Sequence, residues 1–429
     1  MFAGFDYGTS HCAIGRWVDD AVHLVPVEGD ATLIGSALHA PSVRLELPQT
    51  RSGALATDTV AFRDLSFGAA ALDAYLRDPT EGYFVRSPKS FLGASGLPGS
   101  VRERFVTVVA AMMANVKQAL DADAQDSIDS VVIGRPVNFQ GLGGREANAQ
   151  ALAMLEQAAR LAGFTNVAFQ YEPMAAALDY EARLSREELI LVVDIGGGTT
   201  DCSFVRVGGA GRDSLERDAD VLGHAGERRG GNDYDQALAL RAVMPEFGFG
   251  YELSTGLPIP NTYFVDAIST NDVNAQQRFY GQDSHERLTF FARESQAPER
   301  SARLLALHEG RATYRLLRQV ELGKIALSDI AETRIDLDGI EQGFDVAVDR
   351  DAFAQGAERL LQRLQALIDD VIGSAGTQPE TVYLTGGMAK SRIVRDFLAA
   401  RYPDFRLLDS DHFMSVTEGL TRWARRVFA

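Results

Sequence analysis

The stretch that decides the fold is Val193-Asp194-Ile195-Gly196-Gly197-Gly198-Thr199-Thr200. It places an aspartate at the end of an apolar strand, followed by three glycines and two hydroxyl side chains. Because Gly196–Gly198 carry no Cβ atoms, their backbone N–H groups can approach a phosphate closely. A β-hairpin that needs glycine for its turn would show the same residues. A Walker A loop is excluded, since no Gly-Lys-Ser/Thr follows.

A second, shorter copy of this pattern stands near the start of the chain as Phe5-Asp6-Tyr7-Gly8-Thr9-Ser10. In both copies an apolar strand follows the loop. The copies lie too far apart for a solenoid repeat, so a duplicated domain with one loop in each half explains them better. Two such hairpins could grip one nucleotide from opposite sides. Asp6 and Asp194 would then share one Mg²⁺ through waters, because Mg²⁺ dehydrates reluctantly.

Composition bounds the class of protein. The 429 residues are 46% hydrophobic and 24% charged, which is typical of a globular chain with a large core. The formal net charge of −17 argues against binding to nucleic acid or to anionic membranes. The two cysteines, Cys12 and Cys202, each follow one of the loops, and we expect them at duplicate core positions. The chain starts without a signal-peptide pattern and has no apolar stretch long enough to span a bilayer, so we expect a cytoplasmic protein.

Strand-like and helix-like segments alternate along the chain, which favours an α/β class. The expected strands are 2–6, 131–134, 189–194, 202–207 and 381–385, and the expected helices are 101–120, 145–162, 311–330 and 351–372. The region 244–303 differs, since it is rich in aromatics, Asn, Gln, Pro and Gly and has weak periodicity. It is either a folded insertion or a mobile cap.

Several motifs together resemble one known family. They are GFDYGTS (4–10), RSPKSFLG (86–93), YEPMAAALDY (171–180), DIGGGTTD (194–201), GGNDYD (230–235) and VYLTGGMAKSRIV (382–394). They resemble the ATPase domain of the seventy-kilodalton heat-shock chaperones, the DnaK class, and are most similar to the YegD-type chaperone-like proteins of bacteria. The resemblance implies a duplicated actin-like, ribonuclease-H-like α/β ATPase fold, with two lobes around a central nucleotide cleft. Lobe I would be 1–185, with an outer subdomain at about 36–115. Lobe II would be 186–429, with an outer subdomain and insertion at about 233–320.

The resemblance also assigns a role to each motif residue, with ATP or ADP and Mg²⁺ as ligands. Lys89 and Thr199 would stabilise charge on the γ-phosphate, and Glu172 or Asp194 would orient the attacking water. Glu172 could equally be an acidic residue that suits a helix N-terminus. Asp6 and Asp194 would order the metal. The nucleotide would contact Gly8, Thr9, Ser10, Gly196, Gly197, Gly198, Thr199, Gly230, Gly231, Glu321, Lys324, Ser328, Gly386 and Gly387.

The chain departs from the family pattern on the side of the adenine base. Ile325 stands where the family often has an arginine, Met388-Ala389-Lys390 replaces Ser-Thr-Arg, and an acidic position near the C-terminus aligns with about Phe413. Glu321, Lys324 and Ser328 share one helix face, which could simply be a solvated charged face. We therefore expect ATP to bind more weakly, or with less base selectivity, than in a typical chaperone.

Three functions remain open at this point. The first is a slow, chaperone-type ATPase that acts on an unidentified protein partner or client. The second is a nucleotide-gated assembly module, as in filament-forming actin relatives. The third is a small-molecule kinase of the same superfamily, although no motif names its catalytic base. We find no peptide-binding domain of the chaperone kind in this chain, so we expect the insertion or another protein to contact the partner.

Overall fold

The computed structural model describes residues 1–42, 45–78, 82–93, 98–137, 139, 144–182, 184–209, 214–215, 217–409 and 414–429. The chain forms two compact units, each described by itself below. Unit 1 contains Met1–Gly230, Gln365–Ala389 and Tyr402–Ala429, and unit 2 contains Gly231–Leu364 and Lys390–Arg401. The lobes 1–185 and 186–429 stay a prediction. Across the described ranges, no helix is both long and apolar enough to cross a membrane.

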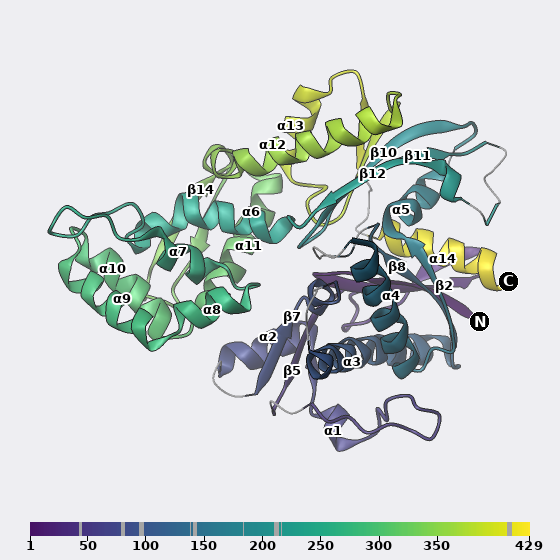
Figure 1. Cartoon of the computed structure of the whole chain (residues 1–429), viewed down its shortest axis with the longest axis horizontal. Helices are drawn as coiled ribbons and strands as arrows, with labels where there is room; N and C mark the ends of the chain where they lie inside the picture. The colour runs from purple at the N-terminus through teal and green to yellow at the C-terminus, as the bar shows by residue number, and fades with distance from the viewer. Residues whose placement is uncertain are drawn as a thin grey trace. The chain divides into compact units, whose positions relative to one another are not determined.

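Unit 1 contains two mixed sheets built on one plan (Figure 1). In strand order the first is β3 (Ala21–Leu24), β2 (His11–Val18), β1 (Phe2–Tyr7), β8 (Ser130–Arg135) and β9 (Asn166–Tyr171), with β4 (Ile34–Gly35) paired to β2. The second is β12 (Val221–Glu227), β11 (Thr200–Val207), β10 (Glu188–Ile195), β15 (Thr381–Thr385) and β16 (Arg406–Asp409). In both sheets a meander of three antiparallel strands is followed by two parallel strands.

The predicted strands are confirmed because their apolar runs are buried in these sheets. Thr381–Thr385 has the predicted bounds, and the other predicted strands gain one or two residues at their ends. The two parallel neighbours, β8 and β15, are buried along most of their length, as continuous apolar strands at a sheet centre should be. A third, small sheet of β6 (Ser66–Phe67), β5 (Ala37–Ala40) and β7 (Tyr83–Arg86) lies in the same unit.

The helices of unit 1 cover the sheets. α3 (Gly99–Ala124) packs against α4 (Gly144–Leu161), and α3 buries a long run of Val, Ala and Met side chains. α5 (Glu172–Glu181) packs against the C-terminal helix α14 (Ser415–Phe428), which is yellow in Figure 1 and also contacts β1 and β8. The short α1 (Val60–Arg63) and α2 (Gly68–Arg77) complete the unit. The predicted helices 101–120 and 145–162 are confirmed.

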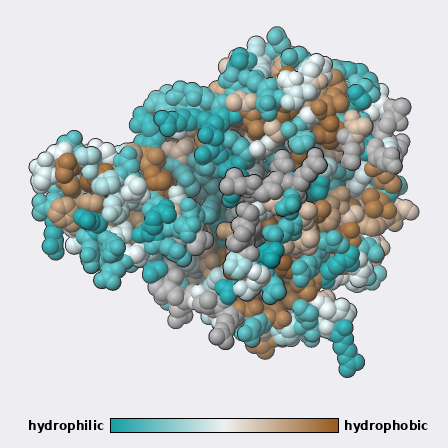
Figure 2. Space-filling view, viewed as in Figure 1, coloured by the Kyte–Doolittle hydropathy of each residue, from teal (hydrophilic) through white to brown (hydrophobic). Residues whose placement is uncertain are grey.

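Unit 2 is mostly helical and contains the region of weak periodicity. Its elements are α6 (Gly231–Leu238), the short turns Ala239–Val243 and Met244–Phe247, α7 (Asn261–Ile268), α8 (Val273–Phe279), α9 (Gln282–Glu294), α10 (Pro298–Glu309), α11 (Thr313–Asp329), the hairpin β13 (Glu332–Asp336) and β14 (Asp345–Asp349), and α13 (Arg392–Arg401). α12 (Arg350–Ala375) runs from unit 2 into unit 1. The region 244–303 is thus a folded insertion of helices. Its face in Figure 2 is mainly hydrophilic, with scattered hydrophobic residues.

The strand register corrects the prediction about the cysteines. Asp6 pairs with Ala13 and Tyr7 with Cys12, whereas Asp194 pairs with Asp201 and Val193 with Cys202. When the two aspartates are superposed, Cys12 corresponds to Thr200, and Cys202 corresponds to Ile14. Both thiols are buried in the core, but two residues apart in the repeat, on the same strand face.

Candidate active site

The first loop joins β1 to β2 and must contain glycine at its start. A Cβ atom on Gly8 would overlap the carbonyl oxygen of His11. The Gly8 carbonyl accepts a 2.7 Å hydrogen bond from Ser36 Oγ, which ties the loop to the protein interior. Thr9 and Ser10 follow and keep part of their surface exposed. The predicted phosphate-contacting residues therefore sit in an anchored loop whose tip remains accessible.

The second loop joins β10 to β11 and is closed by a hydrogen bond from the Gly196 N–H to the Thr199 carbonyl, 2.9 Å long. None of its three glycines has a positive φ, so the backbone conformation does not demand glycine there. Close packing on Gly230 is the tighter constraint. A Cβ at Gly230 would lie 2.5 Å from the Gly196 oxygen and 2.8 Å from the Gly198 nitrogen. The structure thus brings the predicted residues Gly196–Gly198 and Gly230 into contact.

Lys89 and Glu172 form a buried ion pair, although the sequence separates them widely. Lys89 lies in the 3₁₀ turn Pro88–Phe91, and Glu172 is the first residue of α5. Lys89 Nζ lies 2.5 Å from Glu172 Oε1, and only 6% of the lysine side chain is exposed. Burial alone would lower the pKa of Lys89, but the negative charges of Glu172 and Asp6 raise it above its ordinary value. Lys89 is therefore held as a cation.

Asp6 and Asp194 stand at the ends of β1 and β10, and both are half-buried. Burial raises the pKa of Asp6 from 3.8 to about 8; Glu172 and Asp194 add to the rise and Lys89 opposes it. Burial likewise raises the pKa of Asp194 to about 8, with Glu172 and Asp201 adding to it and Lys89 opposing. One lysine cannot neutralise this many carboxylates in a low-dielectric site, so the cluster favours an additional cation.

Asp201 belongs to this cluster, although the sequence analysis gave it no role. It pairs in register with Asp194, it is 5% exposed, and its carboxylate accepts a hydrogen bond from the Thr199 side chain. Burial, with Glu172 adding, raises its pKa to about 7. The sequence motif DIGGGTTD already contains Asp201, as its last residue. Cross-strand pairing with Asp194 follows once the loop is read as a tight hairpin.

Gly386 and Gly387 lie after β15 and before α13, as predicted, although four residues separate Gly387 from the helix. Gly386 has φ = +82° and packs directly on Asp194, whose Oδ1 a Cβ atom would overlap. A Cβ on Gly387 would meet nothing within 4 Å. Contact with Asp194 therefore requires glycine at position 386, whereas a larger residue would fit at position 387.

The predicted ribose and adenine residues lie in unit 2, on α11. Lys324 forms an ion pair with Asp235 at 2.9 Å and donates a 3.3 Å hydrogen bond to the carbonyl of Gly231, where α6 begins. Glu321 pairs with Arg318 at 2.9 Å, and Ser328 is half-buried. Ile325 is 53% exposed. Phe413, the departure predicted near the C-terminus, lies outside the described residues.

Asp6 and Asp194 suit a Mg²⁺ ion whose remaining ligands are water and phosphate oxygens. Throughout the described ranges, no group of three or more His, Cys, Asp or Glu side chains is placed to hold a metal ion alone. Asp6 and Asp194 offer hard carboxylate oxygens at the ends of adjoining hairpins, and Mg²⁺ prefers a few carboxylates completed by water and phosphate oxygens. The residues therefore fit a Mg²⁺ that arrives with a nucleotide better than a resident metal.

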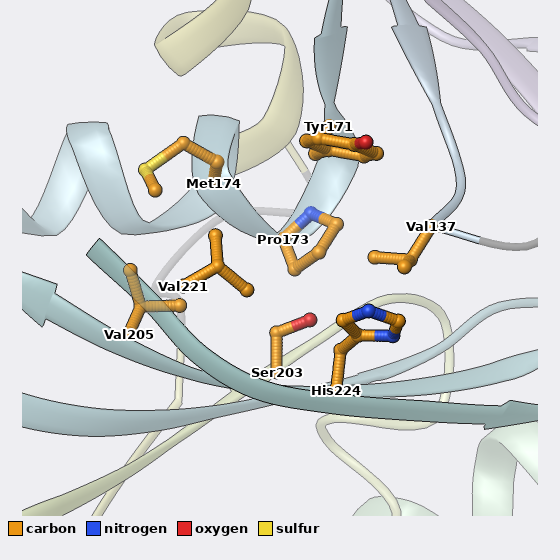
Figure 3. A pocket seen from close by; sticks show the side chains of 8 residues that line it. All are labelled: Val137, Tyr171, Pro173, Met174, Ser203, Val205, Val221 and His224. Carbon is orange, nitrogen blue, oxygen red and sulfur yellow. The ribbon is translucent and has the colours of Figure 1, made fainter. Parts of the chain in front are cut away.

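A cavity of about 250 Å³ is lined by Tyr171 and Pro173, the residues on either side of Glu172 in the sequence (Figure 3). The remaining lining residues are Val137, Met174, Ser203, Val205, Val221 and His224. Figure 3 shows the Ser203 hydroxyl directed toward the space between Pro173, Val221 and His224. None of the predicted nucleotide-contacting residues lines this cavity. Its lining combines apolar side chains with the polar Tyr171, Ser203 and His224, and no lysine or arginine is among the lining residues, so it does not resemble a phosphate site.

Comparison with known proteins adds the family context. Residues 103–253 match the family model described as Hsp70 protein. A chaperone protein HscA homologue of Delftia acidovorans is 28% identical over 243 residues, which cover 55% of this chain and 36% of the relative. A chaperone protein DnaK of Elusimicrobium minutum is 25% identical over 298 residues, covering 67% of this chain and 38% of the relative. About half of the chain is distantly homologous to the HscA and DnaK chaperones. The mixed α/β architecture with two mixed sheets is consistent with the actin-like ATPase fold of Hsp70.

The Hsp70 match has definite limits along the chain. It includes Glu172, the loop at Asp194–Thr199 and Gly230, but not the first hairpin, Lys89 or Gly386. The matched segments also span well under half the length of each of these curated relatives. Placement of Asp6 and Lys89 beside the Hsp70-like segment therefore rests on the structure.

Proposed function

We propose that this Hsp70-like chain is a Mg²⁺-dependent, slow ATPase that binds ATP and ADP between its two hairpin loops. The observation that carries the proposal is the Lys89–Glu172 ion pair, 2.5 Å long, set among the aspartates that end the two hairpins. One buried cation beside several carboxylates, under two glycine-containing loops, suits a polyphosphate that arrives with a divalent metal. The chain's distant homology to HscA and DnaK supports the same function.

In the proposed reaction, water attacks the γ-phosphorus and the bond from that phosphorus to the bridging oxygen of ADP breaks, giving ADP and inorganic phosphate. Lys89 would donate hydrogen bonds to the γ-phosphate oxygens, and Thr199 would add its hydroxyl. Glu172, held in place by Lys89, would orient the attacking water together with Asp194. Asp6 and Asp194 would hold Mg²⁺, which supplies positive charge to the phosphate oxygens when bound. Catalysis by such a site consists of positioning and electrostatic stabilisation.

The biological output proposed here is nucleotide-controlled binding of a protein partner or client, in the manner of a chaperone ATPase. A nucleotide can bias a partner only if two conformations contact it differently. The folded insertion 244–303 is the candidate contact surface, because it exposes Val265 on α7, Phe290 on α9 and Leu257 in the segment before α7.

Hydrolysis of ATP by the purified chain tests the proposal. We expect slow, Mg²⁺-dependent release of phosphate, and a loss of about a hundredfold or more in Lys89→Ala, which removes one preorganised charge. Lys117→Ala is the matched control. Lys117 is equally buried at 6% exposure and is ion-paired with Asp121 at 2.6 Å, but it lies on α3 in a structural role. It should lose stability and keep its turnover per folded molecule.

Unchanged turnover in Lys89→Ala would show that Lys89 is misassigned. ATP-dependent light scattering would instead favour the assembly module, and a phosphorylated metabolite would favour the kinase. Retrieval of partners by an ATP-trapped Asp194→Asn chain, in both nucleotide states, tests the chaperone output. Recovery of nothing above background in either state contradicts that part of the proposal.

A further inference from the structure

Ser36 joins two segments that the proposed function uses but that the sequence separates. It lies between β4 and β5 and is 1% exposed. Its N–H donates to the carbonyl of Ser10 at 2.8 Å, at the end of the first loop. Its carbonyl accepts from the N–H of Ser87 at 2.8 Å, two residues before Lys89. Its hydroxyl donates to the carbonyl of Gly8 at 2.7 Å. One buried serine thus contacts both the first loop and the lysine segment.

The bond to Gly8 has a directional consequence for the loop. In a trans peptide the C=O and the next N–H point in opposite directions from one rigid plane. Since Ser36 Oγ draws the Gly8 C=O toward the interior, the N–H of Thr9 must point away from Ser36. An N–H held in this way is already oriented for an anion, and no rotation is needed when a phosphate arrives.

The bond to Ser87 has a similar consequence for Lys89. Ser87 is 2% exposed and adopts a left-handed backbone, with φ = 56° and ψ = 47°. A residue with a Cβ atom takes this conformation only where its surroundings hold it there. The turn that follows begins with Pro88 and places Lys89 against Glu172. The Ser36 carbonyl therefore helps to hold the bend that aims the lysine.

We infer that Ser36 is a positioning residue for the nucleotide phosphates: its hydroxyl and backbone hold the first loop and the Lys89 turn in one fixed relation. The inference rests on the proposed function. It concerns a residue that touches neither nucleotide nor metal and acts only through Gly8, Ser10 and Ser87. Cys12 Sγ lies 3.3 Å from the same hydroxyl and is a further buried contact of Ser36.

The test is a double-mutant cycle on binding of Mg²⁺ with adenylyl imidodiphosphate, a nonhydrolysable ATP analogue, by calorimetry of the full chain. Ser36→Ala should weaken binding about threefold to tenfold, the size of one lost oriented hydrogen bond. Ser36→Ala removes the hydroxyl bond to Gly8 and keeps the main-chain bonds to Ser10 and Ser87. The loss in Ser36→Ala/Lys89→Ala should be smaller than the product of the two single losses, because the loop held by the hydroxyl and Lys89 would contact the same phosphates. Ser36→Thr, which keeps the hydroxyl, should bind nearly as the unchanged chain does.

Ser284→Ala is the matched control, since Ser284 is 5% exposed, lies in unit 2, and its hydroxyl has no hydrogen-bond partner among the described residues. Its effect with Lys89→Ala should be multiplicative. Affinity unchanged in a folded Ser36→Ala chain, or a multiplicative loss with Lys89→Ala, overturns the inference while the proposed function stands. If the unchanged chain does not bind the analogue at all, both fail. Should Ser36→Ala not fold, Ser36→Cys keeps a weak donor and should show a smaller loss; unaltered affinity there also overturns the inference.

Discussion

The two hairpins of unit 1 share one plan but differ in charge. In each hairpin, the first strand (β1 or β10) has an aspartate next to its last residue, and a glycine-containing loop follows. The second strand pairs with a third antiparallel strand, and two parallel strands lie on the other side of the first strand. Across from the aspartate, however, the first hairpin has Ala13 and the second has Asp201. The first hairpin therefore contributes one carboxylate and the second contributes two.

This difference shows how a repeated scaffold becomes an asymmetric site. The second hairpin concentrates negative charge around Asp194, which Gly386 also contacts. The first hairpin instead has a cation nearby, because the segment held by Ser36 brings Lys89 beside Asp6 and Glu172. Such an arrangement offers a metal side and a γ-phosphate side to one bound polyphosphate.

The largest expected effect comes from removing the aspartate that each hairpin supplies. Asp6→Asn and Asp194→Asn should each lower Mg²⁺-dependent ATP hydrolysis about a hundredfold, because each removes a charge that orders the metal in the proposed function. Asp201→Asn should lower it less, since Asp201 supports the site through Thr199. Phosphate release at increasing Mg²⁺ measures this. Full activity in Asp6→Asn would mean that the two hairpins are not functional counterparts.

Making the first hairpin resemble the second should destabilise it. Ala13 is 1% exposed and pairs across the hairpin with Asp6, so Ala13→Asp would bury a second carboxylate beside the first and lower the free energy of unfolding by about 3 kcal/mol. The reverse change, Asp201→Ala, should leave stability unchanged or raise it, because it relieves repulsion from Glu172. Urea unfolding of both variants decides the matter. Equal losses in the two variants would show that the charge difference between the hairpins is unimportant.

A smaller effect is expected at the glycines behind the second hairpin. Gly386→Ala would force a positive-φ alanine against Asp194 and should cost about 2 kcal/mol of stability. It should also weaken Mg²⁺-nucleotide binding. Gly387→Ala meets open space and is the adjacent control, expected within about 0.5 kcal/mol of the unchanged chain. If both variants behave alike, the contact with Asp194 is not what requires glycine.

The last expected effect is a gradual dependence of stability on pH in the metal-free chain. Asp6 and Asp194 have folded-state pKa values raised from 3.8 to about 8, so the folded state binds their protons more tightly than the unfolded state does. Their contribution is complete below pH 4 and is lost as the pH rises through 8. The unfolding midpoint should therefore fall by a few degrees between pH 5 and pH 8. Thermal scans in chelator would show this.

The double variant Asp6→Asn/Asp194→Asn provides the control for that pH profile. Its midpoint should change less over the same range, with a remaining slope near pH 7 from Asp201. A profile equally steep in the double variant would place the titrating groups elsewhere.

Much of the fold was predictable because it is encoded locally. Apolar runs predicted β1, β8, β10, β11 and β15, but not the outer strands β3, β4, β9, β12 and β16. Helical periodicity predicted α3, α4, α11 and α12 within a few residues. Region 244–303 was harder. Its helices are short and separated by turns, so no period lasts long enough to tell a folded insertion from a cap.

Pairings between distant segments could not be read in the same way. Nothing in 86–93 or 171–180 alone indicates that Lys89 meets Glu172, and only resemblance to a family suggested roles for them. Ser36 belongs to none of the sequence motifs described above. Its three contacts exist because β4 pairs beside the first loop and β5 pairs with β7, the strand that precedes Ser87.

By itself the sequence determined the two hairpins, their aspartates and their glycine loops, since strand alternation and tight turns depend on neighbouring residues. Only the tertiary structure decided that the cysteines are two residues out of step, that Asp201 faces Asp194, and that one serine holds the loop and the lysine together. Register and packing set those relations, and both depend on which distant surfaces are buried against each other.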